Sequence, residues 1–155
     1  MNRLASLSIV IPCYNEEEAL PITYARLKEL CLGWVNVGKI NGYEIVFVND
    51  GSTDRTIDIM RDFFESDKNV VVVDFRKNFG FQCAISAGLF AAQNEMIVSI
   101  DGDLQNDPEK IADMILKYYE GYEVVLGVRK NRAVDGFFKR MTAQLFYRFL
   151  NFLGI

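Results

Sequence analysis

The sequence predicts an α/β fold, an open and mostly parallel sheet with helices on both faces. Short runs rich in Val and Ile alternate along the chain with longer runs whose apolar residues recur at helical spacing. The short runs are nearly continuous in apolar character, which is typical of parallel strands that helices cover on both faces. With 155 residues, of which 50% are hydrophobic, the chain is long enough to form one domain with a substantial core.

Each expected element has its own local signal. The strands are Val- or Ile-rich runs of about five to six residues, namely Ser8–Cys13, Glu44–Asn49, Val70–Phe75, Met96–Ile100 and Glu123–Val128. The helices between them carry apolar residues at helical spacing and are expected at Glu16–Cys31, Asp54–Ser66, Gln82–Ala92 and Pro108–Glu120. Pro108 suits the first turn of the last helix. The stretch Gly33–Gly42 is predicted to be a loop.

The composition restricts the chemistry. The chain has no histidine, which excludes Ser-His and Cys-His nucleophile pairs and every histidine-ligated metal site. A metal is therefore expected to be bound by oxygen. The three cysteines, Cys13, Cys31 and Cys83, are widely spaced without a CxxC pair, so we expect reduced and mostly buried thiols rather than a disulfide framework.

The net charge of −4 is the sum of two unlike parts. Residues 1–128 carry 11 basic and 20 acidic residues, whereas residues 129–155 carry 6 basic and 1 acidic residue, so the net charges are −9 and +5. Between Phe137 and Leu153 a narrow polar stripe faces a wide, aromatic apolar arc. This pattern predicts an amphipathic helix that lies in a membrane interface, or that packs on the sheet or self-associates through its apolar face.

Polar clusters follow four consecutive expected strands. They are Pro-Cys-Tyr-Asn-Glu at 12–16, Asn-Asp-Gly-Ser-Thr-Asp at 49–54, Arg-Lys-Asn-Phe-Gly at 76–80 and Asp-Gly-Asp-Leu-Gln at 101–105. Ligands of open α/β sheets bind beyond the carboxyl ends of the strands, so these clusters are candidate site residues. Turn chemistry alone explains the second cluster about as well, because Asn, Asp, Gly and Ser favour turns.

The fourth cluster is harder to explain as a turn. Asp101, Asp103 and Gln105 alternate with period two, so in an extended backbone the three side chains point the same way. Two carboxylates and an amide oxygen suit Mg²⁺ or Mn²⁺. No Walker-type phosphate loop and no GxGxxG motif follow the first strand, which disfavours nucleotide hydrolysis and nicotinamide chemistry. No nucleic-acid partner is expected.

Together the four ordered motifs resemble family 2 glycosyltransferases with a GT-A-type, Rossmann-like nucleotide-sugar domain. The Arg-x-Asn-x-Gly element, the Asp-Gly-Asp-Leu-Gln form and Gly127-Val128-Arg129 are most similar to the subgroup that acts on polyprenyl phosphates. The resemblance implies that Pro12, Tyr14 and Glu16 line a nucleotide pocket and that Asp50 contacts the base. It also implies that Asp101 and Asp103 hold a divalent metal with Gln105, that Arg76 and Asn78 border the donor, and that Arg129, with Arg132 and Arg140, faces the acceptor phosphate.

The activity that the resemblance implies is inverting, metal-dependent transfer of a hexose from a nucleotide sugar to a polyprenyl phosphate, with UDP-glucose as the first expected donor. A lipid phosphate is already anionic, so it needs cations rather than a general base. Two alternatives stay open, a family member that extends a polysaccharide on a sugar hydroxyl and a non-catalytic nucleotide-sugar-binding module.

The resemblance also bears on organisation and location. We expect a donor-binding domain over residues 1–135, an amphipathic helix over 136–155, and a chain truncated relative to its relatives, which extend further. The expected location is the cytoplasmic side of a membrane, peripheral for this chain.

Overall fold

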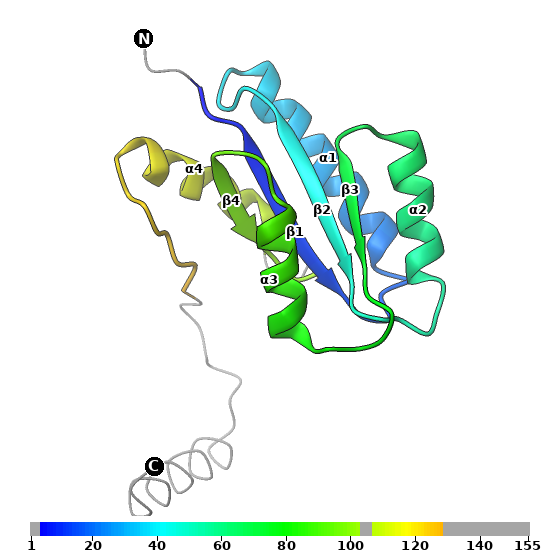
Figure 1. Ribbon diagram of the computed structural model, residues 1–155. Helices are drawn as coiled ribbons and strands as arrows, with labels where there is room; N and C mark the ends of the chain where they lie inside the picture. The colour runs from blue at the N-terminus through cyan, green and yellow to red at the C-terminus, as the bar shows by residue number, and fades with distance from the viewer. Residues whose placement is uncertain (1–3, 103–106, 129–155) are drawn as a thin grey trace, which may run out of the picture. The chain divides into compact units, whose positions relative to one another are not determined.

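The computed structural model describes residues 4–102 and 107–128, and the described part of residues 1–123 forms one compact unit. Four parallel strands form its sheet in the order β3-β2-β1-β4 (Figure 1). They are β1 (Leu7–Cys13), β2 (Tyr43–Asn49), β3 (Val70–Asp74) and β4 (Met96–Ser99). The helices are α1 (Leu20–Asn36), α2 (Thr56–Ser66), α3 (Phe81–Ala91) and α4 (Ile111–Tyr119), the last preceded by a short 3₁₀ turn, Pro108–Lys110. The predicted α/β class is confirmed.

Strand order explains why helices cover both faces. The chain moves outward from β1 to β2 and β3, then returns past them to place β4 on the other side of β1. Because parallel crossovers are right-handed, reversing the direction of travel puts α3 on the face opposite α1 and α2. Phe47, Leu27 and Met60 accordingly belong to one core cluster, whereas Val10 and Ala84 belong to the other.

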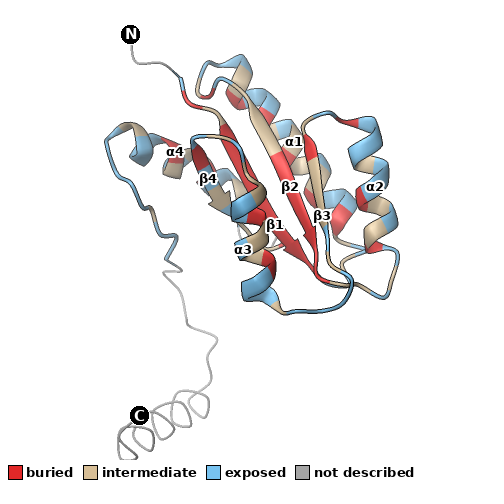
Figure 2. Ribbon diagram, viewed as in Figure 1, coloured by how far each residue is buried: buried red, intermediate tan, exposed pale blue. Residues whose placement is uncertain are grey.

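The central strand is the most deeply buried part of the fold. Every residue of β1 is buried, as expected for an apolar strand between two neighbours and two layers of helix (Figure 2). Gly88 lets α3 approach the sheet closely, because a Cβ there would lie only 2.3 Å from Val10 Cγ1. The sheet is therefore a rigid base for the loops at its carboxyl end.

Two predicted boundaries and one predicted strand are wrong. Helix α1 begins at Leu20 rather than Glu16, because the residues before it form a turn bonded to the loop after β2. The predicted loop at Gly33–Gly42 is helical up to Asn36, since the buried Trp34 continues the apolar face.

The strand expected at Glu123–Val128 does not form. Val124, Leu126 and Val128 are 75%, 80% and 81% exposed. Within residues 4–102 and 107–128 no other strand pairs with this stretch. An apolar run becomes a strand only where a neighbouring strand accepts its backbone hydrogen bonds, and that requirement is not visible in the run itself.

Candidate nucleotide-sugar site

A cavity of about 330 Å³ opens at the carboxyl ends of the strands. It lies beside β1 and β4, the neighbouring strands between which the chain reverses the direction in which it adds strands to the sheet. This is the topological switch point of the sheet, where open α/β folds bind their ligands. Six of the predicted site residues line it together, namely Pro12, Tyr14, Glu16, Asp50, Asn78 and Asp101. Four loops far apart in the sequence, one after each strand, therefore meet at one place.

The loop after β1 is tied to the loop after β2 by paired hydrogen bonds. Asn15 adopts a positive φ of 57°, and its backbone N–H donates to Ser52 Oγ at 3.0 Å. Its side-chain oxygen accepts from Thr53 N at 2.8 Å, and Glu16 N donates to Thr56 Oγ1 at 2.8 Å. Ser52 and Thr53 thus stabilise the turn by hydrogen bonding to Asn15, and neither residue lines the cavity.

Asp54 also serves this turn. Burial opposes its ionisation, but hydrogen bonds from the hydroxyl and N–H of Thr56 and from the N–H of Glu17 outweigh burial and lower the pKa of its carboxyl. The side chain is therefore ionised at neutral pH and stabilises the start of α2.

Asp50 joins β2 to the loop before α3. Its side chain is buried, with the residue only 4% exposed. One carboxylate oxygen accepts from Phe79 N at 2.7 Å, and the other accepts from Gly80 N at 3.0 Å. Two backbone donors compensate the burial of this charge, so Asp50 lines the cavity and holds its opposite wall.

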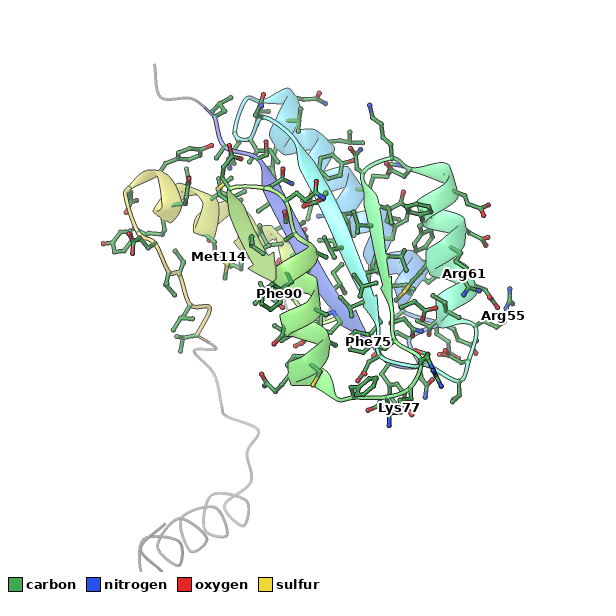
Figure 3. All side chains as sticks on the ribbon, viewed as in Figure 1. Arg55, Arg61, Phe75, Lys77, Phe90 and Met114 are labelled. Carbon is green, nitrogen blue, oxygen red and sulfur yellow. The ribbon has the colours of Figure 1, made fainter. Side chains whose placement is uncertain are left out.

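Gly51 makes this arrangement possible. Its φ is +66°, and a Cβ on it would lie 2.2 Å from the carbonyl carbon of Lys77 and 2.4 Å from Asn78 N. The loop after β2 therefore contacts the loop after β3 backbone to backbone. Figure 3 shows Lys77 and Phe75 at this end of the sheet, where the Lys77 ammonium lies 5.2 Å from the centre of the Phe79 ring.

Three acidic residues line the cavity, namely Glu16, Asp50 and Asp101, and none of the lining residues that the structure describes is Lys or Arg. Carboxylates repel a diphosphate, and their oxygens are the ligands that Mg²⁺ and Mn²⁺ prefer. Cys13 also lines the cavity, but burial and the nearby Glu16 raise the pKa of its thiol, so it is not a thiolate nucleophile.

The sequence analysis missed Phe81 and Ala84 in the first turn of α3. Both line the cavity together with Gly80 of the third polar cluster, and no side chain caps the N-terminus of this helix. Helix N-termini favour negative charge, so this wall complements the acidic residues opposite. A glycine followed by an aromatic residue at the start of an apolar helix was the available signal.

Arg76 is exposed and is not among the lining residues, unlike Asn78 two positions later. Asp103, Gln105, Arg129, Arg132 and Arg140, and the predicted helix over 136–155, lie outside the described residues. Within the described part of the chain, no three Asp, Glu or Cys side chains gather as a metal site. No helix there is long and apolar enough to cross a bilayer.

The chain is similar to proteins of one family. The model for Glycosyl transferase family 2 matches residues 8–154. The glycosyltransferase YkcC of Bacillus subtilis is 50% identical over 97% of this chain and 45% of its own length. The bactoprenol glucosyl transferase of Shigella phage SfV is 40% identical over 94% of this chain and 46% of its own length. The chain thus spans less than half the length of these relatives.

Solved structures share the fold. A mannosyltransferase from Pyrobaculum calidifontis, solved with GDP-Man and Mn²⁺, superposes on 74% of this chain and 32% of its own chain, with a TM-score of 0.56 and 21% identity. Residues 1–349 of Staphylococcus aureus TarS superpose on 81% of this chain and 38% of their own, with a TM-score of 0.58 and 22% identity. These likenesses confirm a Rossmann-like, GT-A-type fold.

Proposed function

Because the chain belongs to glycosyl transferase family 2, we propose that it binds a nucleotide sugar at the carboxyl ends of β1 and β4 and takes part in transferring a hexosyl group to a polyprenyl phosphate. One observation carries the donor half of this proposal, the cavity in which Pro12, Tyr14, Glu16, Asp50, Asn78 and Asp101 meet. Relatives named bactoprenol glucosyl transferases support the acceptor and favour UDP-glucose as the first donor to test.

The proposed reaction needs no histidine. An oxygen of the lipid phosphate attacks the anomeric carbon of the sugar, and a carbon–oxygen bond forms on the face opposite the leaving group. The bond from that carbon to the nucleoside diphosphate breaks, and the diphosphate leaves with the electron pair. Because the acceptor is already anionic, no proton is removed from it, and the chain needs no general base there.

Donor binding falls to the loops described above. Pro12, Tyr14 and Glu16 line the cavity and would bind the nucleotide there. Asp50, whose oxygens accept from Phe79 and Gly80, would contact the base. Asn78, from the loop held by Gly51, borders the diphosphate. The N-terminus of α3 would help to offset the diphosphate charge, since its first backbone N–H groups have no helical acceptor.

A divalent cation fits this acidic cavity. Asp101, with Asp103 and Gln105, would hold it, and the acidic side chains of Glu16, Asp50 and Asp101 along the cavity favour a cation there. When bound, the cation supplies Lewis-acid stabilisation of the leaving diphosphate. Mg²⁺ and Mn²⁺ both suit these oxygen ligands.

On the acceptor side we propose that Arg129, with Arg132 and Arg140, meets the lipid phosphate, since Arg offers forked donors suited to phosphate. We also propose that the basic amphipathic segment 136–155 lies on a membrane surface that faces the cytoplasm. Sedimentation with anionic liposomes tests the segment. Equal binding by a chain ending at residue 135 would refute its membrane role.

The transfer is tested directly by incubating the protein with radiolabelled nucleotide sugars, undecaprenyl phosphate and Mn²⁺. We expect label from UDP-glucose to enter the lipid phase, and Asp101→Asn to abolish the transfer. Asp113→Asn, on the exposed face of α4, is the matched control and should transfer like the parent. Label that appears only in polysaccharide would favour a sugar hydroxyl as acceptor. Nucleotide binding without any transfer would favour a binding module.

A further inference from the structure

Helix α1 reaches the acidic loop after β4 through one buried hydroxyl. Thr23 is fully buried in α1, and its Oγ1 lies 2.6 Å from the carbonyl oxygen of Gly102, 79 positions away in the sequence. The same Oγ1 lies 3.0 Å from the carbonyl oxygen of Ala19 in its own helix. A threonine hydroxyl has one proton to donate, and Gly102 is the nearer acceptor.

Gly102 is fixed from the other side by the end of β1. A Cβ on Gly102 would lie 3.4 Å from Cys13 Sγ, 3.5 Å from Ile11 Cγ2 and 3.7 Å from the Pro12 carbonyl oxygen. The residue is therefore buried between β1 and α1 at the cavity wall. The Gly102 backbone is therefore held in place by contacts with α1 and β1.

The far end of the same loop is also attached to α1. Arg26 lies three residues after Thr23, on the same side of the helix, and forms an ion pair with Glu109. Asp107 accepts from Glu109 N and so caps the 3₁₀ turn that leads into α4. Two consecutive turns of α1 thus hold the loop at residues 102 and 109.

From this geometry we propose that Thr23 is a positioning residue for Asp101, which it serves by fixing the carbonyl of the next residue, Gly102. The inference rests on the proposed function, in which the Asp101 carboxylate helps to hold a divalent cation. Thr23 is buried and is not itself a ligand. It sets the direction of the peptide that follows Asp101, and a carboxylate displaced by a fraction of an ångström binds a small, hard cation less well.

A purely helical role for the hydroxyl makes a different prediction. Thr side chains often bond to the carbonyl four residues earlier in their own helix, which needs no partner outside it. In that case Thr23→Val would leave the acidic loop unchanged. The matched pair is Thr23→Val, which keeps the shape and removes the hydroxyl, and Thr23→Ser, which keeps the hydroxyl.

The experiment measures UDP binding to the 155-residue chain by calorimetry, with Mn²⁺ and with EDTA. In Thr23→Val we expect Mn²⁺-supported affinity to fall by about tenfold, since a buried carbonyl loses its donor, while affinity in EDTA stays within about twofold. Thr23→Ser should restore the parent affinity. Arg26→Gln should change it by less than about threefold, because an exposed ion pair contributes little.

Equal affinity loss with and without Mn²⁺ in Thr23→Val would overturn the inference, since it would show damage to the whole pocket. An unchanged Mn²⁺ effect would overturn it as well. Amide hydrogen exchange of peptides covering residues 100–107, in metal-free protein, gives a readout that does not depend on UDP. We expect faster exchange in Thr23→Val, parent-like exchange in Thr23→Ser, and no change in peptides from β2.

The two measurements separate failure of this inference from failure of the proposed function. A parent protein that binds UDP equally well with Mn²⁺ and with EDTA would refute the cation site itself, and with it the role of Thr23 in that site. Faster exchange in Thr23→Val would then support a loop-positioning role alone. Unchanged exchange would overturn the positioning role whatever the parent protein binds.

Discussion

Replacing Gly51 with alanine should destabilise the protein more than adding a methyl group at any other glycine near the cavity. The φ of +66° at this position puts alanine in the left-handed region, at a cost of about 1–2 kcal/mol. The added Cβ would also lie 2.2 Å from the carbonyl carbon of Lys77. The two loops must therefore separate by roughly 1.3–1.8 Å to reach an ordinary contact distance of about 3.5–4.0 Å.

That separation weakens the bonds that Asp50 accepts from Phe79 N and Gly80 N, at 2.7 Å and 3.0 Å. Hydrogen bonds to a charged group contribute about 1.5–3 kcal/mol each. Losing part of both, together with the backbone strain, gives an expected destabilisation of about 3–5 kcal/mol, a large share of a typical domain's stability. UDP binding should weaken as well, because Asn78 and Gly80 line the cavity.

Gly38→Ala is the matched control. Gly38 has a φ of +67°, but nothing lies within 4 Å of a Cβ there. It should cost about 1 kcal/mol, since the reduced freedom of the unfolded chain offsets part of the strain. Urea denaturation followed by fluorescence of the single, buried Trp34 measures both variants. Equal losses in the two variants would refute the argument that contact with the Lys77 backbone dominates.

Three further predictions concern the scaffold. In the same denaturation assay, Gly88→Ala should destabilise the protein by about 1–3 kcal/mol, because its Cβ would meet Val10. Gly33→Ala should stabilise it by up to about 1 kcal/mol, because Gly33 lies in a helix and nothing lies within 4 Å of a Cβ there. Burial opposes ionisation of Asp67, but the bond from Lys28 helps to lower the pKa of its carboxyl. The stability that the ionised carboxylate adds is therefore present at neutral pH and is lost as pH falls through the acidic range. Between pH 6 and pH 3 the melting temperature of Asp67→Asn should fall less than that of the parent protein, and an equal fall would contradict this. Thiol titration should detect one reactive cysteine in the native chain, the exposed Cys83, and three in denaturant, whereas rapid reaction of a second thiol in the native chain would contradict the burial.

Much of the site was predictable because ligand position in parallel sheets follows from strand direction. Once β1, β2, β3 and β4 are recognised as strands, the residues after them are known to share one edge. Pro12, Asp50, Asn78 and Asp101 do meet there. For Arg76, the prediction that it borders the donor rests only on the Arg-x-Asn-x-Gly motif. In the structure Arg76 is exposed and is not among the residues that line the cavity.

What each polar residue does at that edge was not predictable. Ser52 and Thr53 have the same residue types as a ligand-binding loop, but their hydroxyl and N–H groups bond to Asn15. The Thr23 hydroxyl carried no signal at all, since its partner Gly102 comes from a distant loop. Long-range hydrogen bonds depend on which loops face each other, and residue type alone does not record that.

The sequence by itself determined the α/β class, the four strands that form and the motifs that identify the family. These properties depend on local periodicity and on residue types, which are written directly in the chain. Only the tertiary structure decided that Glu123–Val128 forms no strand, that α1 begins at Leu20 and that α1 grips the acidic loop through Thr23. Each of these depends on a partner distant in sequence, because a strand needs a neighbour and a buried hydroxyl needs an acceptor.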